Sequence, residues 1–92
     1  MGNRSVHAAI FGRVQGVFFR DYTCRKAADL ELTGWVRNCR DGSVECIISG
    51  DDAAVESMID WLHRGSPSAR VERVVIRKTP QDHTLSGFRV VY

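Results

Sequence analysis

The chain has 92 residues, enough for one domain with a single hydrophobic core and too few for two. Apolar residues make up 43% and charged residues 26%, values typical of globular proteins rather than of disordered chains. No apolar run is long enough for a membrane-spanning helix, and residues 1–5 lack the apolar core of a signal peptide. We therefore expect a cytoplasmic protein with no membrane partner.

The net charge of +2 is too small to indicate a nucleic-acid partner. Its distribution is uneven, because residues 1–40 hold seven Arg or Lys against three acidic residues. This bias fits a small anionic ligand near the N-terminal half, and it also fits an ordinary solvated basic face.

The cysteines and histidines do not indicate a metal site. Three cysteines leave at least one unpaired, there is no Cys-x-x-Cys, and no two histidines have metal-ligand spacing. We predict free thiols in a reducing compartment at Cys24, Cys39 and Cys46, and no metal at all.

Hydrophobic periodicity predicts the elements of the first half. Alternation predicts a strand over 6–11, followed by a glycine-containing loop over 12–17. The period then becomes helical from about Phe18, and Thr33-Gly34 is expected to end that helix. Asp41-Gly42 between apolar runs predicts a hairpin of two short strands, 35–39 and 43–49.

The second half repeats the pattern. Asp51 and Asp52 are good helix-starting residues, and an apolar stripe continues to Leu62. Stop signals follow at 63–67, and residues 71–78 form a β-branched strand. After a polar loop over 80–86, residues 88–92 alternate as a last strand.

This order, β-α-β-β-α-β with a short C-terminal strand, predicts an α+β, ferredoxin-like two-layer sandwich formed by one domain over residues 1–92. In such a fold the first two strands run parallel with the third between them. The loop over 12–17 and Asn38 then lie at the same sheet edge, about 10 Å apart.

Residues 12–20 read Gly-Arg-Val-Gln-Gly-Val-Phe-Phe-Arg. A glycine-containing loop before a helix presents free N–H groups and the positive end of a helix dipole, which together bind anions. Gly16 allows the turn, and the Arg20 guanidinium can make two parallel hydrogen bonds to phosphate oxygens. From these residues alone, an ordinary strand-to-helix turn with an incidental arginine is an equally good interpretation.

The stretch resembles a signature of the acylphosphatase family, Gly-x-Val-Gln-Gly-Val-x-Phe-Arg. A second family signature also matches, since Gly-Trp-Val-Arg-Asn at 34–38 is followed by Gly42, Val44 and Gly50. The resemblance extends from about Val6 to Tyr92. Phe18 occupies the variable position of the first signature, where Gly or Cys is expected in many relatives. The larger ring either packs under the helix or narrows the mouth of the site.

The resemblance implies an enzyme that hydrolyses the carboxyl-phosphate bond of acyl phosphates, giving a carboxylate and inorganic phosphate, without metal or organic cofactor. Arg20 would bind the phosphoryl group with the loop amides, and Asn38 would orient the attacking water. The implied catalytic residues are Arg20 and Asn38, and the implied phosphate-binding loop consists of Arg13, Val14, Gln15, Gly16, Val17, Phe18 and Phe19.

The chemistry of these residues agrees with that reaction. A carboxylate leaves without a general acid, and a loose phosphoryl-transfer transition state needs mainly positioning and positive charge. We expect a monomer. We also expect only modest differences in hydrolysis among acyl phosphates with different acyl chains, because no specificity pocket is evident.

Three alternatives remain. A non-catalytic anion-binding or regulatory module would have no use for a water-positioning amide. An RNA-binding module would need exposed aromatic residues on the central strands. Similar domains also occur in larger carbamoyl-transfer proteins, although Met1 at the start and a strand ending at Tyr92 favour a complete small enzyme.

Overall fold

The computed structural model describes residues 2–92, so that Met1, where the predicted domain begins, lies outside the described part. Five strands form one sheet in the order β4-β1-β3-β2-β5. The elements in chain order are β1 (Asn3–Arg13), α1 (Phe19–Asp29), β2 (Thr33–Asn38), β3 (Val44–Asp51), α2 (Asp52–Leu62), β4 (Arg70–Lys78) and β5 (Phe88–Val90). The predicted ferredoxin-like order of elements is confirmed.

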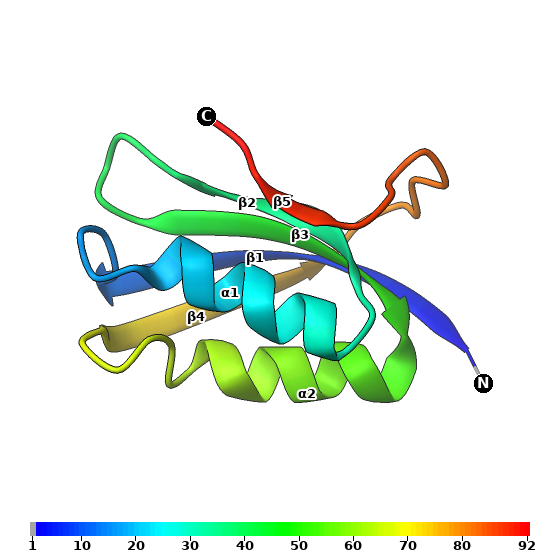
Figure 1. The fold of residues 1–92 in the computed structure, drawn as a ribbon, viewed down its shortest axis with the longest axis horizontal. Coiled ribbons are helices and arrows are strands. Elements are labelled where there is room, and N and C mark those ends of the chain that lie inside the picture. Colours follow the sequence, from blue (N-terminus) through cyan, green and yellow to red (C-terminus); the bar gives the residue numbers. More distant parts are fainter. Residues whose placement is uncertain (1) are drawn as a thin grey trace.

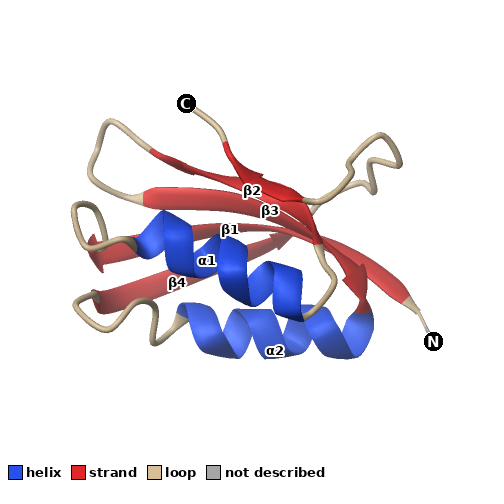
Figure 2. Cartoon of the chain, viewed as in Figure 1, coloured by secondary structure: helices blue, strands red, loops and turns tan. Residues whose placement is uncertain are grey.

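The two helices lie side by side on one face of the sheet (Figures 1 and 2). Strand β3 pairs antiparallel with both β1 and β2, so β1 and β2 run parallel with β3 between them, as predicted. The ends of β1 and β2 therefore reach the same edge of the sheet. This edge carries the β1–α1 loop and the β2–β3 turn (Figure 1).

The apolar stripes of both helices form the core against this face. Helix α2 buries Val55, Met58 and Leu62 completely, and its first turn is capped by Asp51, which accepts a hydrogen bond from the Ala53 N–H at 3.1 Å. Helix α1 buries Phe19, Thr23 and Ala27. No helix within residues 2–92 has the length and apolarity needed to cross a membrane.

Several boundaries differ from those that the sequence predicted, among them those of β1 and α1. Strand β1 is longer than 6–11, because its ends pair beyond the alternating segment, Asn3 with Asp51 and Arg13 with Arg70. Helix α1 ends at Asp29, before Thr33-Gly34. The chain reverses there because Glu31 takes a left-handed conformation with φ 56°, while the Leu32 N–H donates to the Ala27 carbonyl at 2.9 Å.

The freed residues lengthen β2, which begins at Thr33 and takes Gly34 into the sheet opposite Ile48. Gly34 has φ 145°, and a Cβ there would lie 1.8 Å from the Ile47 carbonyl oxygen. This close approach explains the glycine, because any side chain would push the two strands apart.

The C-terminal strand lies at the sheet edge beside β2. Strand β5 pairs parallel with β2, from Gly34 opposite Phe88 to Val36 opposite Val90. The ladder covers only part of the predicted 88–92 segment, and beyond it the Val91 N–H donates to the Val36 carbonyl at 2.9 Å. The chain end is thereby directed toward the edge where β2 ends.

Candidate active site

The loop between β1 and α1, residues 14–18, is held in place by two apolar side chains that pack in the core. Val14 and Val17 are 1% and 5% exposed, so both are part of the core. Between and after them the backbone turns through two left-handed residues, Gly16 with φ 74° and Phe18 with φ 61°. The buried valines therefore fix the loop, while the left-handed residues shape its outer side.

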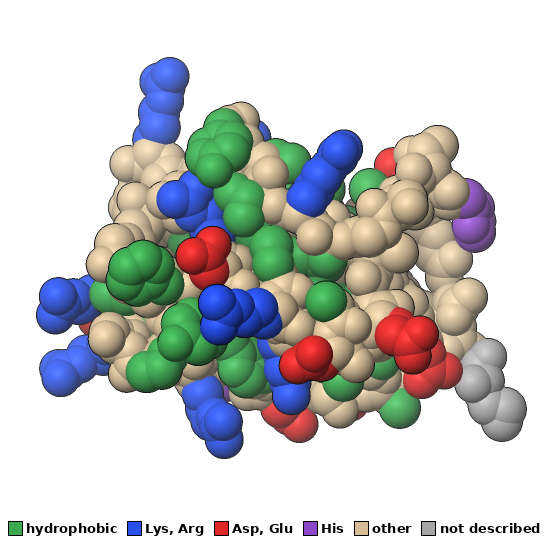
Figure 3. Space-filling view, viewed as in Figure 1, with side chains coloured by type: hydrophobic (Ala, Val, Ile, Leu, Met, Phe, Trp, Pro, Cys, Tyr) green, Lys and Arg blue, Asp and Glu red, His purple; other side chains and the backbone are tan. Residues whose placement is uncertain are grey.

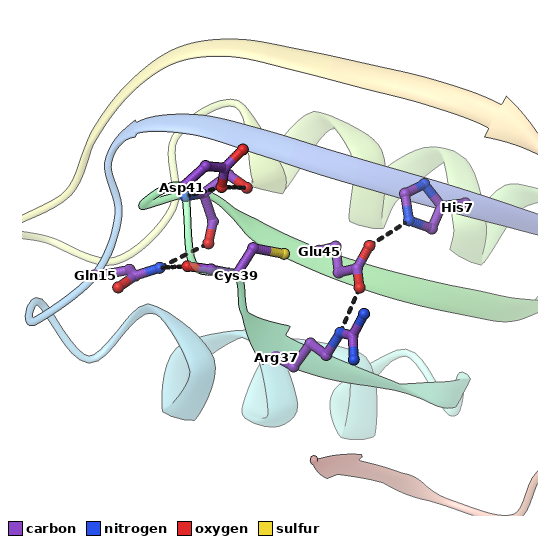
Figure 4. A network of polar contacts seen from close by, with 7 residues as sticks. His7, Gln15, Arg37, Cys39, Asp41 and Glu45 are labelled. Atoms are coloured by element: carbon purple, nitrogen blue, oxygen red, sulfur yellow. Dashed lines mark hydrogen bonds and ion pairs between the residues drawn. The ribbon is translucent and has the colours of Figure 1, made fainter. Parts of the chain in front are cut away.

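Two side-chain contacts hold this loop against its neighbours. The Gln15 amide donates from Nε2 to the carbonyl oxygens of Cys39 and Ser43, both at 2.8 Å (Figure 4). On the other side, the Ser66 hydroxyl donates to the Val17 carbonyl at 2.8 Å. Gln15 thus ties the loop to the turn that directly follows Asn38.

That turn is itself ordered by Asp41. Its carboxylate accepts hydrogen bonds from the Ser43 N–H at 2.9 Å and from the Ser43 hydroxyl at 2.6 Å. The hydroxyl bond, followed by the N–H bond, holds the pKa of Asp41 below its ordinary value. The turn is therefore a firm support for both Asn38 and the Gln15 contact.

The backbone N–H groups of residues 15–18 have no hydrogen-bond acceptor within the described residues. Across residues 2–92, no backbone or side-chain acceptor takes a hydrogen bond from the N–H groups of residues 15–18. They precede the N-terminus of α1, where the helix dipole adds positive potential. Unpaired N–H groups at such a position are suited to bind an anion.

A cavity of about 290 Å³ lies beside the loop, and both predicted catalytic residues line it. Arg20 enters it from the first turn of α1, and Asn38 enters it from the end of β2. The residues that line the cavity are Val14, Gly16, Phe18, Phe19, Arg20, Asp21, Asn38, Val90 and Tyr92.

Three residues of the predicted phosphate-binding loop lie outside this lining. Arg13 is the last residue of β1 and pairs with Arg70, the Val17 side chain is buried, and the Gln15 side chain points to the β2–β3 turn. Phe19 contributes to the lining but packs mainly in the core, where its ring centroid is 5.8 Å from that of Trp61. Phe18, by contrast, stands at the mouth of the cavity and is 72% exposed.

Sequence reasoning missed three lining residues. Asp21 was not named as a site residue but lines the cavity, while Val90 and Tyr92 reach it because β5 pairs with β2. The Arg20 guanidinium lies 5.5 Å from the centre of the Tyr92 ring. No carboxylate of the described residues forms an ion pair with Arg20, so its charge is available to a ligand.

Charge on the surface favours an anionic ligand at this end of the molecule. Figure 3 shows Lys and Arg side chains projecting from the end that carries the loop, with exposed apolar side chains beside them.

A second polar cluster lies on the face of the sheet that the helices do not cover. There Glu45 binds His7 at 2.9 Å and also binds Arg37 (Figure 4). The bond to His7 is the main cause that holds the pKa of Glu45 low. This cluster does not line the cavity.

The described part of the chain has no grouping of three or more His, Cys, Asp or Glu side chains that would hold a metal ion. Its cysteines are all free, with Cys46 buried and Cys24 and Cys39 half-buried. Burial raises the pKa of the Cys24 thiol.

Known proteins match the chain over nearly its whole length. Residues 6–90 match the model of the acylphosphatase family. An acylphosphatase of Thermococcus kodakarensis is 51% identical over 92% of both chains. The structure of an acylphosphatase from Coxiella burnetii superposes with a TM-score of 0.90 at 38% identity, covering 97% of this chain and 93% of that one.

A larger protein contains a similar unit. The structure of T. kodakarensis HypF matches with a TM-score of 0.84 at 28% identity, covering 97% of this chain but only 12% of that one. Both predicted signatures, at 12–20 and 34–50, fall within the family match and supply the loop, Arg20 and Asn38 of the cavity. The chain therefore belongs to the acylphosphatase family, whose enzymes hydrolyse the carboxyl-phosphate bond of acyl phosphates.

Proposed function

We propose that the cavity formed by residues 14–18, Arg20 and Asn38 is where this enzyme hydrolyses acyl phosphates. The observation that carries the proposal is that three features meet in one cavity: loop N–H groups and an arginine that have no acceptor and no carboxylate partner within residues 2–92, and an exposed amide. The first two suit the phosphoryl group and the third suits a water molecule.

The loop and Arg20 bind the phosphoryl group. Its equatorial oxygens accept hydrogen bonds from the N–H groups of residues 15–18 and from the two terminal nitrogens of the guanidinium. The burial of Val14 and Val17 keeps these donors in place before the substrate arrives. Stabilisation by such preorganised donors increases as charge develops on the phosphoryl oxygens.

Asn38 orients the attacking water through its side-chain amide. The water oxygen forms a new bond to phosphorus as the bond between phosphorus and the carboxyl oxygen breaks. The carboxylate leaves with the electron pair, and it needs no proton because its conjugate acid has a pKa of about 4. A phosphate oxygen of the substrate takes the proton from the water, so no separate general base is required.

The same chemistry supports independence from metals and cofactors, because neither the nucleophile nor the leaving group needs activation by a Lewis acid.

A cytoplasmic location is supported by the free cysteines. A monomer is supported by the exposed large apolar side chains of residues 2–92, which are Phe18, Tyr22 and Tyr92 and are too few for a stable dimer interface.

We also propose that no nucleic acid binds to the open face of the sheet. The aromatic rings on that face already have arginine partners, since Arg73 lies 4.3 Å from the Phe11 ring centre and Arg37 lies 5.7 Å from that of Trp35. The comparisons do not favour a non-catalytic anion-binding module either, and such a module would gain nothing from Asn38.

Gln15 is a positioning residue in this mechanism, because it fixes the distance between the phosphate-binding loop and Asn38. Replacing it with alanine removes both hydrogen bonds to the β2–β3 turn. A misplacement of about 1 Å in an active site costs roughly 100-fold in rate. We expect Gln15→Ala to lower kcat for acetyl phosphate by roughly 10- to 100-fold, measured by release of inorganic phosphate.

A split between turnover and binding distinguishes this role from a general structural one. Inhibition by inorganic phosphate should weaken much less than kcat, because phosphate needs only the loop and Arg20. Gln81→Ala, in the exposed β4–β5 loop, is the matched control and should leave both quantities unchanged. If Gln15→Ala had wild-type kcat, the proposed coupling of loop and turn would be wrong.

A further inference from the structure

The cavity has an apolar wall that the phosphoryl group does not use. Phe18 stands on the side of α1, and Val90 and Tyr92 stand on the side of β5. An anion held by the loop and Arg20 gains nothing from the ring of Phe18 or from the methyl groups of Val90. This wall must therefore meet another part of the substrate or the solvent.

Phe18 is unfavourable for folding at its position. It is 72% exposed, so it buries little apolar surface, and no aromatic or cation–π partner within residues 2–92 packs on its ring. Its φ of 61° lies in the left-handed region, which costs free energy for any residue with a bulky side chain. Strained residues of this kind occur preferentially at ligand-binding sites.

The geometry of the substrate brings its acyl group to the same wall. The carboxyl oxygen is the leaving group, and it departs on the side of phosphorus opposite the attacking water. The loop before α1 supplies Val14, Gly16 and Phe18 to the lining, so a phosphoryl group held by the loop N–H groups directs its acyl group away from that backbone toward solvent. Val90 pairs with Val36, so the β5 side of the cavity is the side of Asn38, whereas the Phe18 ring, 72% exposed, comes from the loop before α1.

We propose that Phe18 is a specificity-determining residue that packs against the acyl group and favours acyl phosphates with an aromatic or bulky apolar acyl group. This inference rests on the proposed function, because it requires the phosphoryl group to occupy the loop. It replaces the expectation from sequence that acyl phosphates with different acyl chains are hydrolysed with only modestly different kcat/KM. A well-oriented pair of aromatic rings corresponds to a preference of roughly threefold to tenfold.

The test compares kcat/KM for benzoyl phosphate with kcat/KM for acetyl phosphate in the wild type and in two variants. Phe18→Gly removes the ring and suits the left-handed backbone, and Phe18→Asn keeps a side chain of a type that tolerates this conformation. Comparing the ratio of the two substrates between variants cancels the difference in their intrinsic reactivity. We expect both variants to lower the benzoyl-to-acetyl ratio by roughly threefold to tenfold, mainly through KM for benzoyl phosphate.

The control is Tyr22→Ala, which removes an exposed ring on α1 that does not line the cavity and contacts the Arg25 guanidinium instead. Its benzoyl-to-acetyl ratio should equal that of the wild type. An unchanged ratio in Phe18→Gly, with both substrates turned over, would overturn the role of Phe18 and leave the proposed function standing. If the wild type released phosphate from neither substrate, the proposed function would fail and the inference with it.

Discussion

Replacing Arg20 with alanine is expected to reduce kcat for acetyl phosphate by roughly 100- to 1,000-fold or more, while the protein stays folded. The guanidinium enters the cavity from the first turn of α1 and has no carboxylate partner among the described residues. Losing one preorganised donor to a developing charge costs about 3–4 kcal/mol. The measurement is steady-state phosphate release, with circular dichroism to verify the fold.

Two further arginine variants sharpen this result. Arg25→Ala removes an exposed arginine from the same helix that does not line the cavity, and it should keep wild-type activity. Arg20→Lys keeps the charge but loses the two-pronged geometry, and it should recover only part of the loss. Near-normal turnover by a folded Arg20→Ala protein would refute the assigned role of Arg20.

Replacing Asn38 with alanine should abolish turnover in a different way. The amide is assigned to the attacking water and not to the phosphoryl group, so kcat should fall by roughly 100-fold or more. The inhibition constant for inorganic phosphate should stay within a few-fold of the wild-type value, because the loop and Arg20 remain. The pair of measurements separates positioning of the water from binding of the phosphoryl group.

Asn3→Ala is the matched control, since Asn3 lies at the start of β1 and does not line the cavity. It should leave both quantities unchanged. If Asn38→Ala weakened phosphate inhibition as strongly as Arg20→Ala does, Asn38 would belong to the phosphoryl-binding group and the division of roles would be wrong.

Local patterns in the sequence predicted the frame of the fold. The stripe of α2, the Asp41-Gly42 turn and the alternation in β1 each depend on neighbouring residues, and the structure has all three elements. The crossover order then placed Asn38 and the loop at one edge of the sheet, where the cavity is. Arg20 and Asn38 could be named because both sit in short signatures.

Features that depend on long-range packing were not predictable. The parallel pairing of β5 with β2 brings Val90 and Tyr92 to the cavity, and three residues of ladder leave too weak a pattern to indicate a partner. The left-handed turn at Glu31, which ends α1 early, uses a residue type that rarely takes this conformation. Gln15 was assigned to the loop, but its contacts with Cys39 and Ser43 join segments distant in sequence.

The measurement that tests the account most directly compares kcat/KM for acetyl phosphate with kcat/KM for ethyl phosphate, both in excess EDTA. Acetyl phosphate should be hydrolysed at the full rate, because its carboxylate leaves without a proton or a metal ion. The kcat/KM for ethyl phosphate should be lower by roughly 100- to 10,000-fold or more. Its alkoxide leaving group needs a general acid, and the mechanism gives that role to no residue of the cavity. Comparable values for the two substrates, or loss of acetyl phosphate hydrolysis in EDTA that a divalent metal restores, would contradict the mechanism.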